Sequence, residues 1–316
     1  MHSTNPRIVI ACTTYNHEKY IARTLESFLM QQVREPFAVY IQDDASTDKT
    51  QAIIAEYQKK YPHSIHAVFQ KKNLWQKGYS ITKYALFPSI SAEYVALCEG
   101  DDYFTDPLKI QKQVDFLDSH KEYAICFHPV RIIYDDGKED EIFPNFPDII
   151  EKNDFSLADL LQKNFIQTNS CMYRWRFNEI DTPQKLIPDN ILPCDHFWHL
   201  LHAEKGKIGK LDEIMSVYYR HKDGLWTMDT EGNWYINNAI YHLNFCCEVE
   251  KRYKIINYSQ IKNNLAWNLL MTALQQKKYE LIIQLKQFPD QVKYLVDILK
   301  NDNKEELKAI IKLLQF

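Results

Sequence analysis

Glycine is the residue that this chain has least of. Only 7 of 316 residues are glycine, about 2% against roughly 7% in average proteins. No G-x-G-x-x-G or G-x-x-x-x-G-K-[ST] pattern occurs, and a Rossmann dinucleotide site or a P-loop needs such glycines so that backbone can approach phosphate. G-x-S-x-G and H-E-x-x-H are absent too, which argues against common hydrolases and zinc proteases. If this chain handles phosphate, we expect side chains and a metal to do so.

Long apolar runs and cysteine pairs are also missing. No stretch approaches the roughly 20 apolar residues that cross a bilayer. The opening MHSTNPRIVIAC runs directly into a strand-like segment without signal-peptide features. The seven cysteines include no C-x-x-C pair, and several lie in apolar runs, as buried reduced thiols do. We therefore expect a cytoplasmic protein without a disulfide framework.

Charge is nearly balanced overall but uneven along the chain. Lys and Arg number 38, Asp and Glu 42, and the net charge is −4, so we expect no nucleic-acid partner. Residues 251–316 hold 12 basic and 6 acidic residues, whereas the rest has a surplus of ten acidic charges. A solvated helical face explains this basic region. The alternative is contact with an anionic acceptor or, peripherally, with the inner face of the cytoplasmic membrane.

Strand and helix patterns alternate through the first 130 residues. Apolar runs of strand length occupy 7–12, 37–42, 65–70, 94–99 and 124–134, and helical periodicity occupies 20–32, 79–90 and the segments after Asp48 and Asp106. Asp48 with Gln51 predicts a capping box, and Asp106-Pro107 predicts an N-cap followed by proline. This alternation predicts an α/β fold, with a mostly parallel sheet flanked by helices.

The rest of the chain has a different organisation. Residues 135–228 read as mixed structure, with a helix at 157–163, a strand at 169–174 and a helix from about 195. From about residue 233 the pattern is helical. We expect a catalytic domain over 1–228, with halves at about 1–134 and 135–228, and a C-terminal helical region over 229–316.

Polar residues follow three of the predicted strands directly. Ligands bind beyond the carboxyl ends of such strands. Glu99-Gly100-Asp101-Asp102 places carboxylates where a hard divalent cation could bridge them to phosphate; a helix-capping acidic turn is the alternative. Asp43 and Asp44 could accept a hydrogen bond from the imide N–H of uracil, or could only shape a turn. The segment 13–17, TTYNH, suits base stacking and hydrogen bonding.

Four blocks together carry a family resemblance. TTYNHEKYIARTLESFLMQ, QDDASTDKT, NLWQKG and CEGDDYFTDPLKIQKQVDFL resemble, in order and spacing, the family 2 glycosyltransferases of the GT-A fold. The resemblance covers about residues 7–228. It implies an inverting transferase that uses a nucleotide-activated sugar and a divalent metal, Mn²⁺ or Mg²⁺.

The same resemblance implies roles for residues of the donor side. Asp101 belongs to the D-x-D metal motif, here in an E-G-D-D form with Glu99 where the first Asp often stands. The segment YRHKDGLW resembles the loop that closes over the diphosphate, so His221 would contact metal or phosphate. The expected donor-binding residues are Thr13, Tyr15, Asn16, Asp43, Asp44, Asn73, Gly78, Asp101 and Trp226.

On the acceptor side, the segment PCDHFW resembles the one that supplies the catalytic base, which would be Asp195. Capping of the following helix is the alternative role for Asp195 and does not exclude catalysis. Many relatives carry glycine where this chain has Cys194, which could change the shape of the pocket. The residues expected at the acceptor or sugar pocket are Asp102, Ser170 and Cys194.

Two groups of histidines invite a zinc interpretation. His196, His199 and His202 recur every three residues, and His242 lies near Cys246 and Cys247. For the first group we favour helix packing with ordinary hydrogen bonds, and a zinc site is the alternative. The second group has no further ligand pair in sequence, which disfavours zinc there.

The leading hypothesis is a hexosyltransferase that moves a sugar, from a UDP-sugar, to a hydroxyl of a bacterial surface glycan such as capsule, lipopolysaccharide or a lipid-linked oligosaccharide. The acceptor rests on family analogy alone. One rival is a sugar nucleotidyltransferase, but its glycine-rich loop after the first strand has no counterpart in residues 13–17. The other is a non-catalytic nucleotide-sugar or glycan-binding module, which the joint presence of Asp43, Asp101, Asp195 and His221 disfavours.

Overall fold

The computed structural model describes residues 6–77, 80–178, 182–224, 238–254, 257–300 and 310–314. Internal contacts divide the chain into two units. The first comprises Met1–Asp189 and Asp195–Lys222, and the second comprises Asn190–Cys194 and Asp223–Phe316. Each unit has its own apolar core.

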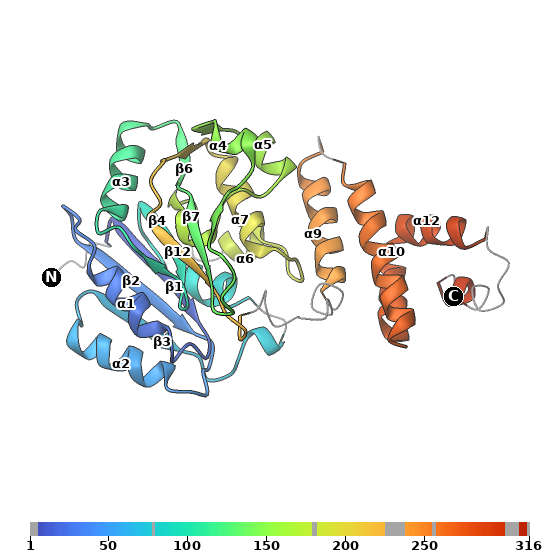
Figure 1. Ribbon diagram of the computed structural model, residues 1–316, viewed down its shortest axis with the longest axis horizontal. Coiled ribbons are helices and arrows are strands. Elements are labelled where there is room, and N and C mark those ends of the chain that lie inside the picture. Colours follow the sequence, from blue (N-terminus) through green and yellow to red (C-terminus); the bar gives the residue numbers. More distant parts are fainter. Residues whose placement is uncertain are drawn as a thin grey trace. The chain divides into compact units, whose positions relative to one another are not determined.

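A sheet of eight strands forms the centre of the first unit (Figure 1), in the order β3-β2-β1-β4-β10-β6-β11-β9. Strand β1 pairs in parallel with β2 and β4, β3 continues this parallel half, and β10 runs antiparallel between β4 and β6. The strands are β1 Ile8–Thr14, β2 Phe37–Asp43, β3 Ile65–Phe69, β4 Tyr94–Glu99, β6 Tyr123–Phe127, β9 Asp154–Phe155, β10 Met172–Arg174 and β11 Lys207–Lys210.

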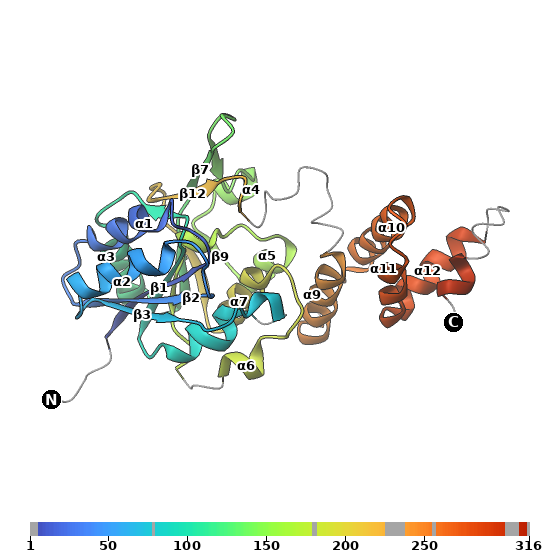
Figure 2. The ribbon, with the colours of Figure 1, turned by 90° about the horizontal axis from the view of Figure 1, so that it is seen from below.

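A smaller sheet of four strands has the order β5-β12-β7-β8. Figure 2 shows β7 and β12 side by side, where they pair in parallel. Strand β5 immediately follows the Glu99–Asp102 segment, so this sheet begins at one of the predicted ligand loops. Its strands are β5 Tyr103–Phe104, β7 Val130–Tyr134, β8 Glu141–Phe143 and β12 Ser216–Arg220.

Helices cover the large sheet and bury its parallel strands on both faces. Ile8, Ile10 and Cys12 of β1 pack in one core cluster with residues of the first three helices, and the alternate residues Val9 and Ala11 are buried as well. Burial on both faces explains why this strand is a continuous apolar run. The helices of this part are α1 Ile21–Leu29, α2 Thr50–Lys60, α3 Lys109–Ser119, α4 Pro147–Ile150, α5 Leu157–Gln162, α6 Thr182–Leu186 and α7 Cys194–Ala203. The predicted α/β class with a mostly parallel, helix-flanked sheet is confirmed.

Several predicted elements differ in detail. The single strand expected over 124–134 is two strands, β6 and β7, in different sheets. The break falls at His128-Pro129, and proline cannot donate to a strand ladder. The helix expected over 79–90 is a π-turn at Thr82–Leu86 and a 3₁₀ turn at Phe87–Ser89 among the described residues. The segment 169–174 begins with a 3₁₀ turn, Thr168–Ser170, before β10.

Two predicted helix caps are also wrong. Helix α2 begins at Thr50 without a side-chain cap, and Asp48 accepts hydrogen bonds from the Thr50 amide and hydroxyl. Gln51 reaches Asp43 instead. Helix α3 begins at Lys109, two residues beyond the proline. A capping box does occur at α5, between Ser156 and Asp159.

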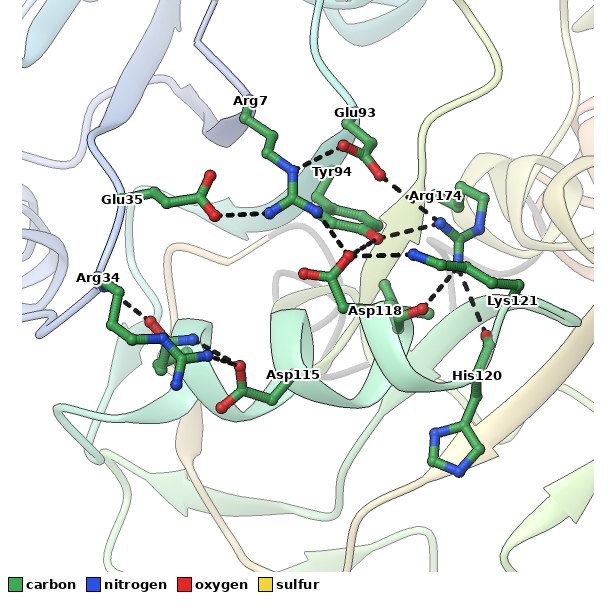
Figure 3. Close-up of polar contacts among 12 residues, drawn as sticks. Arg7, Arg34, Glu35, Glu93, Tyr94, Asp115, Asp118, His120, Lys121 and Arg174 are labelled. Carbon is green, nitrogen blue, oxygen red and sulfur yellow. Dashed lines mark hydrogen bonds and ion pairs between the residues drawn. The ribbon is translucent and has the colours of Figure 1, made fainter.

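An ion-pair network joins the chain entering β1 to helix α3 (Figure 3). Arg7 donates to Glu93 at 2.7 Å, to Glu35 at 2.7 Å and to Asp118 at 2.5 Å. Arg174 of β10 donates to the Tyr94 hydroxyl at 3.0 Å, and that hydroxyl donates to Asp118. Because these carboxylates are a third or more exposed, the network orients elements more than it stabilises them. It lies at the amino ends of β1 and β4.

The three histidines of α7 are buried in the first unit. Nε2 of His196 lies 2.8 Å from the Leu160 carbonyl oxygen, and Nδ1 of His202 lies 2.8 Å from that of Trp198. His199 Nδ1 lies 2.5 Å from the Tyr173 hydroxyl. Burial lowers the pKa of His196 to about 4 and that of His202 to about 3.

From residue 238 onward, the described part of the second unit is mainly helical, as predicted for the C-terminal region. Its core contains Leu243, Leu269, Leu270 and Leu295. The helices are α9 Ala239–Arg252, α10 Ser259–Gln275, α11 Tyr279–Gln284 and α12 Pro289–Leu299, and residues 310–314 are also helical. Within the described residues of the chain, no helix combines the length and apolar character needed to span a membrane.

The buried histidines predict a loss of stability in acid. Between about pH 6.5 and their lowered pKa values, the unfolded chain binds protons that the folded chain does not, so stability falls as pH falls. By pH 5 the loss is roughly 2 kcal/mol for each such histidine. Urea unfolding of His202→Asn should therefore show a smaller loss between pH 7 and pH 5 than the parent, by roughly that amount. Exposed His63 provides the control His63→Asn, which should lose stability as the parent does; an equal loss in His202→Asn contradicts the prediction.

Candidate active site

The three polar loops predicted from sequence meet at one edge of the large sheet. Strand register places Thr14 of β1 beside Asp43 of β2, and Thr13 beside Glu99 of β4. Main-chain hydrogen bonds continue this pairing past the strand ends, from the Asp44 amide to the Thr14 carbonyl and from the Gly100 amide to the Thr13 carbonyl, each at 2.9 Å. The carboxyl ends of parallel strands thus assemble one candidate site.

The loop after β1 is tied to the loop after β2. Asn16 has a positive φ of 55°, its side chain accepts from the Thr47 amide at 2.8 Å, and its own amide donates to the Ser46 hydroxyl at 2.8 Å. Tyr15 stands beside it with 36% of its surface exposed. An exposed ring on a fixed loop suits stacking against a flat ligand.

Asp43 and Asp44 are buried and strongly engaged with the protein. Asp43 accepts from the Ser46 amide and hydroxyl and from the Gln51 side chain, at 2.5–2.9 Å. Asp44 accepts from the amides of Leu74 and Trp75 at 2.6 and 3.1 Å. The Asn73 side chain donates to the Asp44 carbonyl oxygen at 3.0 Å.

These bonds show that both aspartates shape the loops around them. Contact with a nucleotide base by Asp43, Asp44 or Asn73 stays a prediction. Two further residues expected at the donor site, Gly78 and Trp226, lie outside the described residues.

Helix α1 holds the backbone of the Glu99–Asp102 loop. The Thr24 hydroxyl lies 2.6 Å from the carbonyl oxygen of Asp102, to which it donates, and 3.0 Å from that of Gly100. Arg23 donates to the Asp101 carbonyl oxygen at 3.3 Å. A Cβ atom at Gly100 would lie 2.7 Å from the Thr14 hydroxyl oxygen and 2.8 Å from Nδ1 of His17. The loop therefore requires glycine at this position because the neighbouring side chains fill the space.

Two imidazoles flank the Asp101 carboxylate. Oδ2 of Asp101 lies 3.0 Å from Nε2 of His221 and 3.6 Å from Nε2 of His17. Oδ1 of Asp101 is buried and has no hydrogen-bond partner within the described part of the chain. The Tyr20 ring lies 4.3 Å from that of His221. Sequence reasoning assigned no role to His17, whose only signal was its place in the polar segment after β1.

Asp195 lies at the start of α7, within electrostatic reach of this loop. Its carboxylate accepts from the amide of His196 at 2.8 Å and lies 3.4 Å from the Thr168 hydroxyl. The bond to His196 goes to the adjacent residue and Asp195 is the second residue of α7, whereas a capping side chain accepts from an amide two or three residues ahead; capping by Asp195 is therefore not seen. Asp195 as a whole residue is half-buried, and each of its two carboxylate oxygens has one of these contacts.

The pKa values of Glu99, Asp101 and Asp195 are shifted in different directions. Burial, with the charges of Asp101 and Asp195, raises the pKa of Glu99 to about 8, although solvent reaches its side chain. Burial alone would raise the pKa of Asp101, but His17 and His221 bring it below its usual value. Burial raises the pKa of Asp195. Perturbed pKa values gathered at one sheet edge are typical of functional sites.

The residues expected at the acceptor pocket are placed differently. Asp102 and Ser170 have no accessible surface. Both carboxylate oxygens of Asp102 accept hydrogen bonds from the protein, and the Ser170 hydroxyl donates to the Gln167 carbonyl oxygen at 2.6 Å. Cys194 is half-buried, and its thiol lies 3.0 Å from the Ile191 carbonyl oxygen. Acceptor contact by these residues stays a prediction.

A metal site is not preformed in this arrangement. Among the residues that the structure describes, no three His, Cys, Asp or Glu side chains are grouped so that they could hold an ion. Asp101 nevertheless offers a buried oxygen without a partner, with Glu99 and His221 near it. Carboxylates of this kind bind Mg²⁺ or Mn²⁺ when substrate phosphates and water supply the remaining ligands.

Solved structures with the same fold confirm the GT-A architecture. The chain is similar to S. aureus TarS 1–349 in complex with UDP, with a TM-score of 0.58, 14% identity and coverage of 96% of this chain and 83% of that one. It is also similar to the mannosyltransferase PcManGT from Pyrobaculum calidifontis in complex with GDP-Man and Mn²⁺, with a TM-score of 0.52, 12% identity and coverage of 99% and 85%.

Two curated relatives align over much of the chain. An uncharacterized protein of Mycobacterium tuberculosis is 44% identical over 217 residues, which are 69% of this chain and 60% of that protein. The minor teichoic acid biosynthesis protein GgaB of Bacillus subtilis is 25% identical over 299 residues, which are 86% of this chain and 31% of GgaB. The chain thus spans no more than about 60% of the length of these relatives.

The family model described as "Glycosyl transferase family 2" matches residues 9–181. This match covers the strands β1, β2 and β4 and the loops at their carboxyl ends. Because it extends over more than half of the chain, the chain belongs to glycosyl transferase family 2.

Proposed function

We propose that the chain is a metal-dependent, inverting hexosyltransferase that moves a sugar from a UDP-sugar to a hydroxyl of a bacterial surface glycan or a lipid-linked oligosaccharide. The observation that carries the proposal is the meeting of Asp101, Glu99 and Asp195 at the carboxyl edge of the sheet. Asp101 and Glu99 could hold a metal ion beside the leaving diphosphate, and Asp195 could take the proton of the attacking hydroxyl. Family membership supports the same reaction class.

The donor would bind over the loops that follow β1 and β2. Tyr15 and Asn16 stand exposed at the first loop, and the second loop is fixed by its own hydrogen bonds, so the surface is preorganised for a nucleotide. UDP is the nucleotide we favour, because TarS, which shares the fold, has been solved with UDP and with UDP-GlcNAc.

A divalent cation would be held by Asp101 and His221, with Glu99 as a further ligand. The unpartnered Oδ1 of Asp101 is the observation that fits such an ion. When bound, Mn²⁺ or Mg²⁺ would neutralise the charge that develops on the leaving diphosphate. PcManGT, a protein of the same fold, has been solved with Mn²⁺.

Asp195 would act as the general base. In the proposed step, the acceptor hydroxyl loses its proton to the Asp195 carboxylate, and its oxygen bonds to the anomeric carbon. The bond from that carbon to the nucleoside diphosphate breaks on the opposite face, so the configuration inverts. The raised pKa of Asp195 brings its basicity closer to what proton abstraction near neutral pH requires.

The acceptor proposal rests on relatives and on charge. GgaB is named for teichoic acid biosynthesis, which favours a surface polymer. The surplus of basic residues in 251–316 supports a peripheral contact with an anionic lipid surface. Co-sedimentation that shows no preference for anionic over neutral vesicles would remove the membrane part of the proposal.

Replacing Asp195 by asparagine tests the base directly. With UDP-GlcNAc as donor and water as acceptor, Asp195→Asn should release UDP at a rate roughly 100-fold below that of the parent or lower, because proton abstraction is lost. Its affinity for UDP should stay unchanged, since the donor side is intact. Asp212, whose side chain is 74% exposed, provides the control Asp212→Asn, which should retain the parental rate. Full activity in Asp195→Asn would remove the assignment.

Gly100→Ala tests whether the Glu99–Asp102 loop, here called the metal loop, must keep its backbone conformation to bind the proposed metal. The new Cβ would collide with Thr14 and His17, so the loop carrying Asp101 must shift. We expect weaker binding of UDP with Mn²⁺ in calorimetry and a lower free energy of unfolding, by about 1–3 kcal/mol. At Gly137 nothing lies within 4 Å of a Cβ, so Gly137→Ala should cost only backbone strain, about 1–2 kcal/mol, and bind as the parent does. Parental binding by Gly100→Ala would show that the loop tolerates the shift.

A further inference from the structure

A buried polar group connects the three segments that carry the proposed catalytic side chains. Oδ2 of Asp102 accepts from the side-chain amide of Asn169 at 2.9 Å, and Oδ1 accepts from the backbone amide of Tyr219 at 2.9 Å. Asn169 also donates to the Val217 carbonyl oxygen at 2.8 Å, and the Ser216 hydroxyl lies 3.1 Å from its amide oxygen. We call Asp102, Asn169 and Ser216, all with no accessible surface, the buried hub.

The hub lies between elements that are distant in sequence. Asp102 belongs to the loop of Asp101, the proposed metal ligand. Asn169 belongs to the 3₁₀ turn that also contains Thr168, the neighbour of Asp195. Ser216 begins β12, the strand that ends just before His221. The hub is therefore the hydrogen-bonded connection between the metal loop, the turn beside the base and the strand leading to His221.

The chemistry of the hub is specific to a carboxylate at position 102. Each oxygen of the Asp102 carboxyl group accepts from an N–H donor, Oδ2 from the Asn169 side-chain amide and Oδ1 from the Tyr219 backbone. An asparagine at position 102 would present an NH₂ group to one of these donors and leave a buried group unsatisfied. The Tyr219 amide is two residues from His221, so the bond to Oδ1 fixes the end of β12 nearest the proposed metal.

We propose that the hub is a positioning device for the transfer reaction, in which Asp102 and Asn169 hold β12 so that His221 faces Asp101. This inference rests on the proposed function. It also gives Asp102 a different role from the acceptor contact expected from sequence, because here Asp102 positions the proposed metal ligands Asp101 and His221. Mutation of groups that orient metal ligands without touching the metal typically lowers metal affinity by roughly 10- to 100-fold.

The test compares two hub variants with a matched buried control. Asp102→Asn and Asn169→Ala disturb the hub, whereas Gln31→Leu removes a buried amide that bonds to Ser27, Asp106 and Ile110 away from the site. Calorimetry measures UDP binding with and without Mn²⁺, and electron paramagnetic resonance follows Mn²⁺ alone.

We expect both hub variants to lose at least about ten-fold in Mn²⁺-dependent UDP affinity. UDP affinity without metal should stay at the parental value, because the loops after β1 and β2 are untouched. Gln31→Leu should lose stability but keep parental binding in both conditions. Ser216→Ala, which removes only one hydroxyl of the hub, should show a smaller loss in the same direction and serves if Asp102→Asn does not fold.

Hydrogen exchange gives a readout that needs no ligand. The amides of β12 should exchange faster in Asp102→Asn and Asn169→Ala than in the parent or in Gln31→Leu. Parental exchange in β12, or parental Mn²⁺-dependent binding in both hub variants, overturns the inference. A parent chain that binds no UDP, with or without Mn²⁺, instead overturns the proposed function, so the two failures are distinguishable.

Discussion

The confinement of four carboxyl groups at one edge of the sheet is the constraint on which the site depends. Like charges in a partly desolvated space repel, so each acid must be neutralised or bonded. The structure meets this need in different ways. The pKa of Glu99 is raised to about 8. Asp101 lies between two imidazoles, and Asp102 accepts two hydrogen bonds. Asp195, at the start of α7, has a pKa that burial raises.

This crowding has a consequence for the donor. A nucleoside diphosphate is itself an anion, and it would be repelled by an acidic strand edge unless a cation stood between them. A divalent ion relieves the repulsion among the acids and attracts the diphosphate at the same time. The proposed metal would thus act on the charges of both sides, those of the protein and those of the donor.

The fold and the location of the site follow from short-range patterns. Apolar runs and helical periodicity predict the order of strands and helices, and the rule that ligands bind beyond strand ends selects the loops containing Asn16, Asp43 and Asp101. Local chemistry was less predictable. Asp48 and Asp106 carry cap-like signals, but both helices begin later, at Thr50 and Lys109. Each aspartate accepts from the amide two residues ahead, Thr50 and Leu108.

Contacts between distant segments explain what sequence reasoning missed. His17 and His221 are more than 200 residues apart, and only the meeting of β1, β4 and β12 brings both to Asp101. Asp102 resembles its acidic neighbour in sequence, yet its side chain turns inward because Asn169 and the Tyr219 amide donate to it. No pattern within one segment encodes such a bond.

Thermal unfolding against nucleotides, with and without Mn²⁺, tests the central claim most directly. A ligand at about 100 times its dissociation constant adds roughly 2.7 kcal/mol of stability, which raises the midpoint by several degrees for a chain of this length. The account predicts that UDP or a UDP-sugar raises the midpoint when Mn²⁺ is present, and much less without it, whereas CDP and dTDP do not. If no nucleotide shifts the midpoint in either condition, the edge of the sheet is not a donor site and the proposed function is wrong.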